Sequence, residues 1–245
     1  MQIIKSRLFQ EFPEIVLGIS TKIGKYTASP FHFNLSFTVG DDPEIVWKNR
    51  EMFFSELGLS SEQIAVQKQI HSDIITIVDR AGLVGESDGL ITTKQNLGLA
   101  VSTADCVPIF IYDGEKKVIA GIHSGWSGTQ KQILRKALNI LVEKFGSNPE
   151  DMNVFVGPSI CQKNYEVGDE VAAQFNQKYS MKKDGKIYLD LRQANIDLIY
   201  EFGIPEFQVE VSTLCSYEEK ELLHSYRRDG KLSGRSLGVI AMKGI

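Results

Sequence analysis

The sequence predicts one α+β domain, residues 1–245, with mixed β-sheets flanked by helices. Two observations lead to this prediction. Segments rich in β-branched and aromatic residues intermix with helical segments, but they lack the strict alternation of a parallel βαβ array. In addition, the chain contains no repeat of fixed period and no linker rich in Pro, Gly or Ser, so a single compact domain is favoured over two.

Three segments have the apolar spacing of helices that pack on a core. In "DDPEIVWKNREMFFSELG", Asp42 can cap the helix, Pro43 suits its first turn and Gly58 can end it. The second segment runs from about 129 to 145, before Gly146. Its predicted core face consists of Ile133, Leu134, Ala137, Leu138, Leu141 and Val142. The third is "DLRQANIDLIYEFG", with apolar positions at Leu191, Ala194, Leu198 and Phe202.

Short β-rich segments lie between the predicted helices and are bounded by Gly, Asp and Asn. They are "IITIV", "VPIFIY", "KVIAGI", "NVFVG" and "FQVEVST". We predict that these segments are strands of mixed sheets.

Composition and charge exclude several classes of protein. The net charge of −4 and the pI near 5.7 argue against non-specific nucleic-acid binding, which needs a basic surface. No segment approaches the roughly 20 consecutive apolar residues of a membrane span, and "MQIIKSRLFQEF" lacks the features of a secretory signal. We therefore expect a cytoplasmic protein with neither nucleic acid nor membrane as a partner. A small polar ligand remains open.

The residues with the strongest chemical potential are His71 in "QKQIHSD", Cys106 in "TADCVPIF" and His123 in "GIHSGW". All three lie at the edges of predicted strands, where a scaffold can hold ligands that stay reachable. Two imidazoles and one thiolate match a catalytic zinc site, in which a fourth position is left for water or substrate. Their separations match no zinc finger, so two hydrogen-bonded histidines and a buried thiol are the alternative.

Three other chemistries use similar residues. A hydrolase with Cys106 as nucleophile, His123 as base and Asp105 as third member is compatible with the sequence. The motif of zinc nucleobase deaminases is absent, because "HSD" and "ADCVP" contain neither of its pairs. A blue multicopper oxidase needs many more imidazoles than the four histidines of this chain.

Anion-binding groups occur at two places. The loop "HSGWSGT" offers backbone N–H groups and leads toward a predicted helix, although a tight strand-to-helix turn explains it equally well. Arg50 follows Asn49 on the first helix, and "HSYRRDGKLSGRS" contains Arg227 among small and aromatic residues, a mixture that suits bidentate anion recognition. Cys161 and Cys215 are interpreted as small apolar or pocket-lining residues, not as metal ligands. Disulfides are not expected.

Several motifs together resemble the YfiH-type laccase-domain family, also called multicopper polyphenol oxidoreductases. In chain order they are "NLSFTVGDDPEIVWKNR", "QIHSD", "SDGLITT", "TADCVPIFIYD", "AGIHSGWSGT", "GPSICQKNYEVGDEV" and "SYRRDGKLSGRS". The likeness extends from about residue 15 to 243, nearly the whole chain.

The resemblance implies an α+β fold with mixed sheets, usually as a monomer, and zinc held by His71, Cys106 and His123. It also implies phosphorolysis of adenosine, inosine, guanosine and methylthioadenosine, together with adenosine deamination. Copper is the alternative metal, since phenol oxidation gave the family its laccase name. Some members are linked instead to hydrolytic editing of peptidoglycan precursors.

On this basis we expect purine nucleosides and phosphate as ligands. Zinc would activate water for attack on C6 of adenosine, with Asp73 or Asp105 as proton carrier. Arg50 and Arg227 are predicted to bind phosphate, and Tyr165 or Trp126 to stack on the base.

Two positions depart from the family pattern. Ser127 stands where the family usually has an arginine, which weakens the expectation of phosphorolysis, and His224 stands where it has a phenylalanine. Two rival functions stay open: a metal-independent thiol hydrolase or amidase with Cys106 as nucleophile, and a non-catalytic zinc-dependent domain that binds nucleosides.

Overall fold

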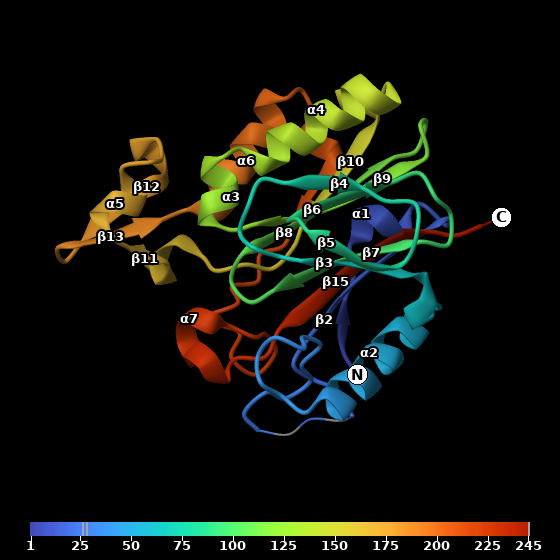
Figure 1. Cartoon of the computed structure of the whole chain (residues 1–245). Coiled ribbons are helices and arrows are strands. Elements are labelled where there is room, and N and C mark those ends of the chain that lie inside the picture. Colours follow the sequence, from blue (N-terminus) through green and yellow to red (C-terminus); the bar gives the residue numbers. More distant parts are fainter. Residues whose placement is uncertain (26, 28, 245) are drawn as a thin grey trace.

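The computed structural model describes residues 1–25, 27 and 29–244, which fold as stacked layers of helices and sheets (Figure 1). Two mixed sheets pack face to face through an apolar core that includes Leu99 and Val101 from one sheet and Phe110 and Ile119 from the other. Helix α2 (Pro43–Glu56) covers the outer face of the first sheet. Helices α4 (Ile133–Phe145) and α6 (Leu191–Glu201) cover the outer face of the second. The predicted α+β class with mixed sheets is confirmed.

The first sheet combines antiparallel and parallel pairs. Its antiparallel pairs are β1 with β2, β2 with β15, and β15 with β7. Strand β3 pairs in parallel with β7 on one side and with β5 on the other. In spatial order the strands are β1 (Ile3–Ile4), β2 (Ile15–Ser20), β15 (Ser236–Met242), β7 (Gly98–Thr103), β3 (Ile64–Lys68) and β5 (Gly82–Glu86).

The second sheet is antiparallel at its centre and parallel at both edges. In spatial order its strands are β14 (Val209–Val211), β10 (Met152–Val156), β8 (Val107–Asp113), β9 (Val118–Ser124), β6 (Gly89–Thr92) and β4 (Ile75–Ile77). The predicted strands "VPIFIY", "KVIAGI" and "NVFVG" are β8, β9 and β10. "IITIV" and "FQVEVST" form only the short strands β4 and β14.

A small antiparallel sheet projects from this body beside helix α5 (Asp169–Ala172) (Figure 1). It consists of β11 (Glu166–Val167), β13 (Lys186–Leu189) and β12 (Ser180–Lys183). The remaining helices are short: α1 (Arg7–Gln10), α3 (Trp126–Gln130) and α7 (Tyr226–Asp229). Single 3-10 turns are η1 (Ser61–Gln63), η2 (Pro149–Asp151), η3 (Gln162–Asn164), η4 (Gln177–Tyr179), η5 (Glu206–Gln208) and η6 (Gly230–Leu232).

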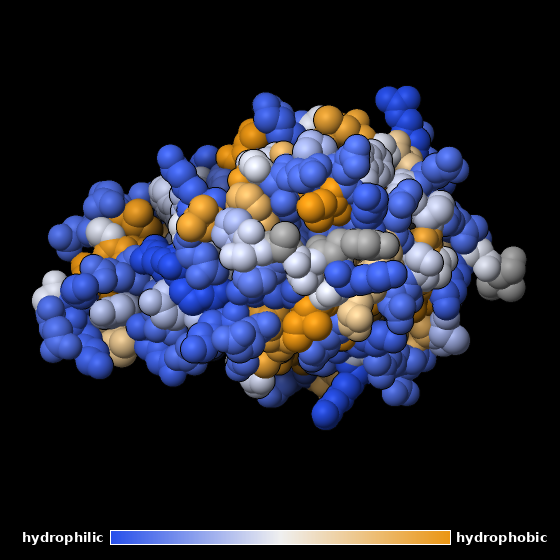
Figure 2. Space-filling model, turned by 90° about the horizontal axis from the view of Figure 1, so that it is seen from below, coloured by the Kyte–Doolittle hydropathy of each residue, from blue (hydrophilic) through white to orange (hydrophobic). Residues whose placement is uncertain are grey.

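The central strands are buried along their whole length. Every residue of β8, β9, β10 and β15 is buried, because a second layer covers each face of both sheets. The surface seen in Figure 2 is mostly hydrophilic, with small separate hydrophobic areas. Among the described residues, no helix combines the length and apolar character needed to cross a bilayer.

The first and third predicted helices are confirmed as α2 and α6. The Asp42 carboxylate accepts from the Glu44 N–H at 2.9 Å, Pro43 begins the helix, and Gly58 has φ +72° just beyond its end. Of the predicted core positions, Leu191, Ala194 and Leu198 are buried, whereas Phe202 follows the end of α6 and is half-buried.

The second predicted helix is wrong at its start. A break at Gln132, with φ +59°, separates α3 from α4. The buried face of α4 is otherwise as predicted, except that Val142 is 36% exposed. Helical structure already begins at Trp126, inside the segment predicted to be an anion-binding loop. We find no sequence signal for this break, because Gln is not a residue that favours a left-handed conformation.

His224 makes stability sensitive to acid. Its side chain is 2% exposed, and Nε2 lies 3.3 Å from the Phe33 carbonyl oxygen. Burial lowers the pKa of His224 to about 3. Between that value and the ordinary pKa of about 6.5, the unfolded chain binds a proton that the folded chain does not. The stabilisation is therefore present above the unfolded pKa and decreases as the pH falls below it.

We expect His224→Phe to flatten this dependence, since phenylalanine has no proton to bind. In the wild type, His224 should lower the free energy of unfolding by about 3 kcal/mol between pH 7 and pH 4.5. Urea unfolding of both proteins at the two pH values measures the difference. An equal loss in both would show that His224 does not cause the acid sensitivity.

Candidate metal centre

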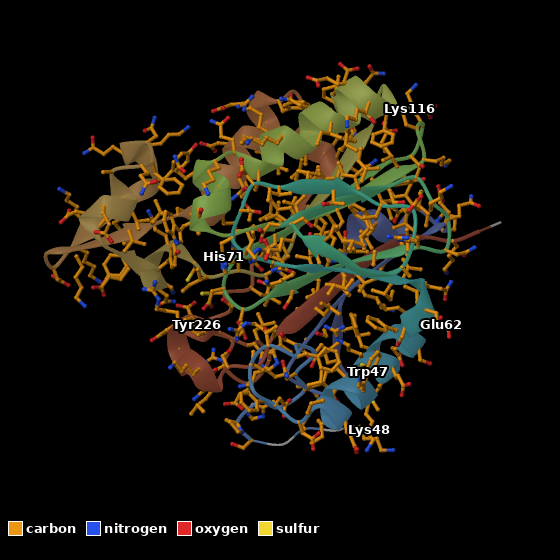
Figure 3. All side chains as sticks on the ribbon, viewed as in Figure 1. Trp47, Lys48, Glu62, His71, Lys116 and Tyr226 are labelled. Carbon is orange, nitrogen blue, oxygen red and sulfur yellow. The ribbon has the colours of Figure 1, made fainter. Side chains whose placement is uncertain are left out.

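His71, Cys106 and His123 converge at one end of the two central sheets. Their potential ligand atoms all lie within 4.8 Å of one another. Cys106 precedes β8 and His123 is on β9, and the pairing of Pro108 with His123 across these strands brings the two side chains together. His71 comes from the loop between β3 and β4, and Figure 3 places it at the sheet end that faces α7 and the small sheet.

The Asp88 carboxylate holds two of these residues in place. Its Oδ2 accepts hydrogen bonds from the Ser72 N–H at 2.6 Å, the Ser72 hydroxyl at 2.7 Å and the Ile70 N–H at 3.2 Å. Its Oδ1 accepts from the His71 N–H at 3.1 Å and lies 2.8 Å from Nδ1 of His123. When Nδ1–H is donated to Asp88, Nε2 is the nitrogen left to bind a metal, as in carboxylate–histidine–metal arrangements.

Burial and hydrogen bonding shift the pKa of Asp88 in opposite directions. The carboxylate is fully buried, which raises its pKa, but the donors led by His123 and Ser72 outweigh this effect and lower the pKa to about 2. Asp88 is therefore ionised at neutral pH. Sequence reasoning missed its role. The available signal was the short "SDG" before the apolar residues of β6, which places a carboxylate at a strand end.

The space among the three candidate ligands is kept open by a glycine. A Cβ at Gly125 would lie 3.0 Å from the Cys106 Sγ and 3.0 Å from Cδ2 of His71. The two imidazole rings stand at 76° to each other with centroids 5.0 Å apart. His71 is exposed, Cys106 is half-buried and His123 is buried. Two nitrogens and one sulfur on an accessible face fit zinc, which binds such sets tetrahedrally, and also fit copper.

Cys106 and His123 also influence each other's ionisation. Burial would raise the pKa of Cys106, but the nearby imidazoles, His123 first, outweigh it and lower the pKa. For His123, burial would lower the pKa, and the charges of Cys106 and Asp88 raise it instead. The protein therefore favours a thiolate at Cys106, the form in which cysteine binds metals and acts as a nucleophile.

Asp105 accepts hydrogen bonds from neighbouring segments of the chain. Its Oδ1 accepts from the Ser216 hydroxyl at 2.6 Å and its Oδ2 from the Arg227 N–H at 2.7 Å. Its carbonyl accepts from the Ile160 N–H at 2.9 Å, and its φ is +94°. The carboxylate that contacts His123 is Asp88, so the predicted combination of Cys106 and His123 with Asp105 is wrong in its third member.

Tyr165 and Arg227 lie beside the candidate metal centre. The Arg227 guanidinium lies over the Tyr165 ring, with Cζ 5.0 Å from the ring centroid, and donates to the Glu166 carbonyl at 2.5 Å. The pKa of Tyr165 is raised, first by burial and then by the charge of Cys106. The Arg227 N–H also donates to the carboxylate of Asp105, the residue before Cys106, so the ring and the cation lie near Cys106.

Asp73 and Arg50, which were also predicted to be site residues, contact residues other than the three candidate ligands. Asp73 forms an ion pair with Lys136 of α4, and this hydrogen bond lowers the Asp73 pKa. Arg50 is on α2, where its Nε donates to the Leu35 carbonyl at 2.7 Å and its Cζ lies 4.6 Å from the centroid of the Phe37 ring. The structure thus places Arg50 on the outer helix layer, in contacts unrelated to the three candidate ligands.

Trp126 and Ser127 form the first turn of α3. Trp126 is half-buried and packs on the core beneath α4 and α6. Helix α3 has only five residues, so the predicted anion-binding loop is a short strand-to-helix connection.

A second group of donors lies among the described residues. The potential ligand atoms of Cys161, Cys215 and Glu218 also lie within 4.8 Å of one another. This group belongs to the loops after β10 and β14 and shares no residue with the first.

Comparisons with known proteins agree with this architecture. The family model described as multi-copper polyphenol oxidoreductase laccase matches residues 16–243. A purine nucleoside phosphorylase of Bacteroides thetaiotaomicron is 34% identical over 226 residues, covering 85% of this chain and 84% of that protein. Purine nucleoside phosphorylase YlmD of Bacillus subtilis is 33% identical over 252 residues, with 96% and 91% covered. The crystal structure of the hypothetical protein YfiH from Bacillus licheniformis superposes with a TM-score of 0.91 at 32% identity, covering 96% of this chain and 95% of that one.

We expect Asp88→Asn to weaken metal binding about 10- to 100-fold, the usual effect of losing such a supporting carboxylate. The neutral amide supports the His123 imidazole less well, and its NH2 group replaces one acceptor oxygen with a donor that faces other N–H donors. Competition with a chelator of known affinity measures the change. Asp73→Asn is the matched control, because Asp73 pairs with Lys136 and should leave the affinity unchanged. Equal affinities in the two variants would remove Asp88 from this role.

Proposed function

Because this chain belongs to the multi-copper polyphenol oxidoreductase laccase family, we propose that it is a zinc-dependent purine nucleoside phosphorylase that also deaminates adenosine. His71, Cys106 and His123 hold the metal. The names of the relatives from Bacteroides thetaiotaomicron and Bacillus subtilis support the phosphorylase activity. The observation that carries the proposal is the convergence of the three donors beside Tyr165 and Arg227.

In phosphorolysis, the bond from the ribose C1′ to the purine nitrogen breaks and a bond from C1′ to a phosphate oxygen forms. Arg227 binds phosphate through N–H groups of its planar guanidinium, which offers five donors and uses one on the Glu166 carbonyl. The Tyr165 ring packs against the nucleoside, and the Arg227 guanidinium lies over the same ring. A metal held by His71, Cys106 and His123 would supply a Lewis acid that stabilises developing negative charge.

In deamination, water adds to C6 of adenosine and ammonia leaves. This reaction requires a proton carrier. We assign this role to Asp73, because its side chain is 26% exposed and can exchange protons with solvent once it separates from Lys136, its ion-pair partner. Both carboxylate oxygens of Asp105 are engaged by Ser216 and Arg227. Asp105 therefore positions the segments that carry Arg227 and Ser216.

A thiol hydrolase is the second candidate function. The chain of contacts from Cys106 to His123 and on to Asp88 resembles a nucleophile, base and orienting carboxylate. Such an enzyme needs no metal. A chelated, metal-free protein that still hydrolyses amides but leaves inosine intact would favour it. A protein that binds nucleosides without turnover would favour the non-catalytic alternative.

We expect about one zinc per chain, and Cys106→Ala should lose most of it because three donors leave no redundancy. Metal analysis after exhaustive dialysis measures the content. Cys161→Ser and Cys215→Ser are matched controls and should keep wild-type zinc. Full retention of zinc by Cys106→Ala would contradict the assignment.

We expect Arg227→Ala to weaken phosphate-dependent cleavage of inosine about ten- to a hundredfold and to spare ammonia release from adenosine. A charge-assisted contact contributes about 1.5 to 3 kcal/mol, which corresponds to that range. Alanine keeps the backbone N–H that donates a hydrogen bond to the Asp105 carboxylate. The two assays on the same preparation separate the effects, and equal loss of both reactions would assign Arg227 to the nucleoside or the fold.

Ser127→Arg tests the departure from the family pattern. If a cation at this position helps to bind phosphate, the variant should have a lower KM for phosphate in inosine cleavage, with ammonia release from adenosine unchanged. Ser127→Gln, a long neutral side chain, is the matched control. A KM that falls equally in both variants would show that charge is not the cause.

A further inference from the structure

We propose that Cys161 and Cys215 form a redox-active dithiol, which small disulfides oxidise reversibly to an intramolecular disulfide. The two Sγ atoms lie 2.7 Å apart. Cys161 is half-buried and Cys215 is buried, so an oxidant reaches the pair from the Cys161 side. The sequence indicated small apolar or pocket-lining residues at these two positions and gave no signal for the contact between their sulfurs.

The backbone fixes the two cysteines opposite each other. Ser159 and Cys215 form an isolated parallel bridge, and the Ser216 N–H donates to the Ser159 carbonyl at 3.1 Å. The Arg192 guanidinium donates to the carbonyls of Ser159 and Leu214, both at 2.9 Å. The two segments are therefore tied together on both sides of the sulfurs, and formation of a bond needs little backbone movement.

The surroundings of the pair favour one thiolate and one thiol. The Cys161 N–H donates to the Cys215 Sγ at 3.2 Å, and the Asn164 amide donates to the two sulfurs at 3.2 Å and 3.6 Å. Burial raises the pKa of Cys215, but these donors and the Cys161 thiol outweigh it and lower the pKa. Burial raises the pKa of Cys161. As Cys161 attacks, the Cys215 thiolate takes its proton across their contact, so the buried sulfur acts as the base and the accessible sulfur as the nucleophile.

The proposed reaction follows thiol–disulfide exchange. The Cys161 thiolate attacks one sulfur of a low-molecular-weight disulfide, RSSR, and one RS⁻ leaves. The Cys215 sulfur then attacks the Cys161 sulfur, forms the Sγ–Sγ bond and releases the second RS⁻. Two electrons pass from the protein to RSSR, and the two thiol protons yield two RSH.

A metal fits these residues less well than a disulfide does. Glu218 is already bound by Lys163 at 2.6 Å and by the Asn164 amide at 3.1 Å. Tetrahedral zinc, with Zn–S near 2.3 Å, holds two thiolates roughly 3.8 Å apart. The observed separation of 2.7 Å is nearer to the bond length of about 2.05 Å.

The dithiol is connected to the metal centre through Asp105. The residue before Cys161, Ile160, donates its N–H to the Asp105 carbonyl, and the residue after Cys215, Ser216, donates its hydroxyl to the Asp105 carboxylate. Beyond Cys161, η3 leads directly to Tyr165. A disulfide therefore cross-links the segments that position Asp105 and Tyr165. We expect oxidation to change the KM for inosine reversibly. This kinetic effect rests on the proposed function, whereas formation of the disulfide does not.

The direct test is mass spectrometry of the metal-loaded protein after incubation with glutathione disulfide. We expect a loss of two hydrogen atoms, a peptide joining Cys161 to Cys215, and a fall in thiols titrated under denaturing conditions from three to one. Dithiothreitol should restore all three. Cys106→Ser should still form the disulfide, while Cys161→Ser and Cys215→Ser should not.

Three outcomes would overturn the proposal: three thiols that stay free, a disulfide that includes Cys106, or zinc retained by the pair in Cys106→Ala. The inosine assay before and after oxidation is a separate arm. If the cross-link forms and no nucleoside is cleaved in either state, the dithiol stands and the proposed function fails.

Discussion

The candidate site depends on one buried carboxylate. Asp88 has no exposed surface, and it accepts hydrogen bonds from the loop that carries His71 and from the ring of His123. A buried charge is costly unless donors surround it, so its presence requires the Ile70–Ser72 loop to aim consecutive N–H groups inward. His71 takes a left-handed conformation, with φ +56°, to meet this requirement. The backbone of His71 and the imidazole of His123 are thereby fixed by the same group.

The second sheet fixes the positions of Cys106 and His123. Cys106 and His123 sit at neighbouring ends of β8 and β9, whose register is fixed because a shift by one residue would turn buried side chains to the opposite face. Gly125, immediately after β9, leaves the space between the Cys106 sulfur and the His71 ring. A rigid core thus presents Cys106 and His123, whereas His71, Tyr165 and the two other cysteines come from loops and Arg227 from the short helix α7.

Much of the fold and the three candidate ligands could be predicted from the sequence, because β-rich segments, helix caps and apolar spacing are local signals. His71, Cys106 and His123 stood out as scarce residue types at strand edges. What the sequence could not supply were contacts between distant segments. Asp88 is 35 residues from the ring that it orients, and Cys161 is 54 residues from Cys215. Arg50 was predicted to bind phosphate from its residue type, yet its guanidinium contacts Leu35 and Phe37. The break at Gln132 was also missed, because no local preference of the sequence reveals it.

X-ray absorption at the zinc edge, on protein purified with its metal, tests the proposed centre most directly. Metal held by His71, Cys106 and His123 should give one sulfur near 2.3 Å and two imidazole nitrogens at about 2.0 to 2.1 Å, with a light fourth ligand. A shell of two sulfurs would place the metal at Cys161 and Cys215, and a shell without sulfur would exclude Cys106 as a ligand. Either result would contradict the account of the site given above.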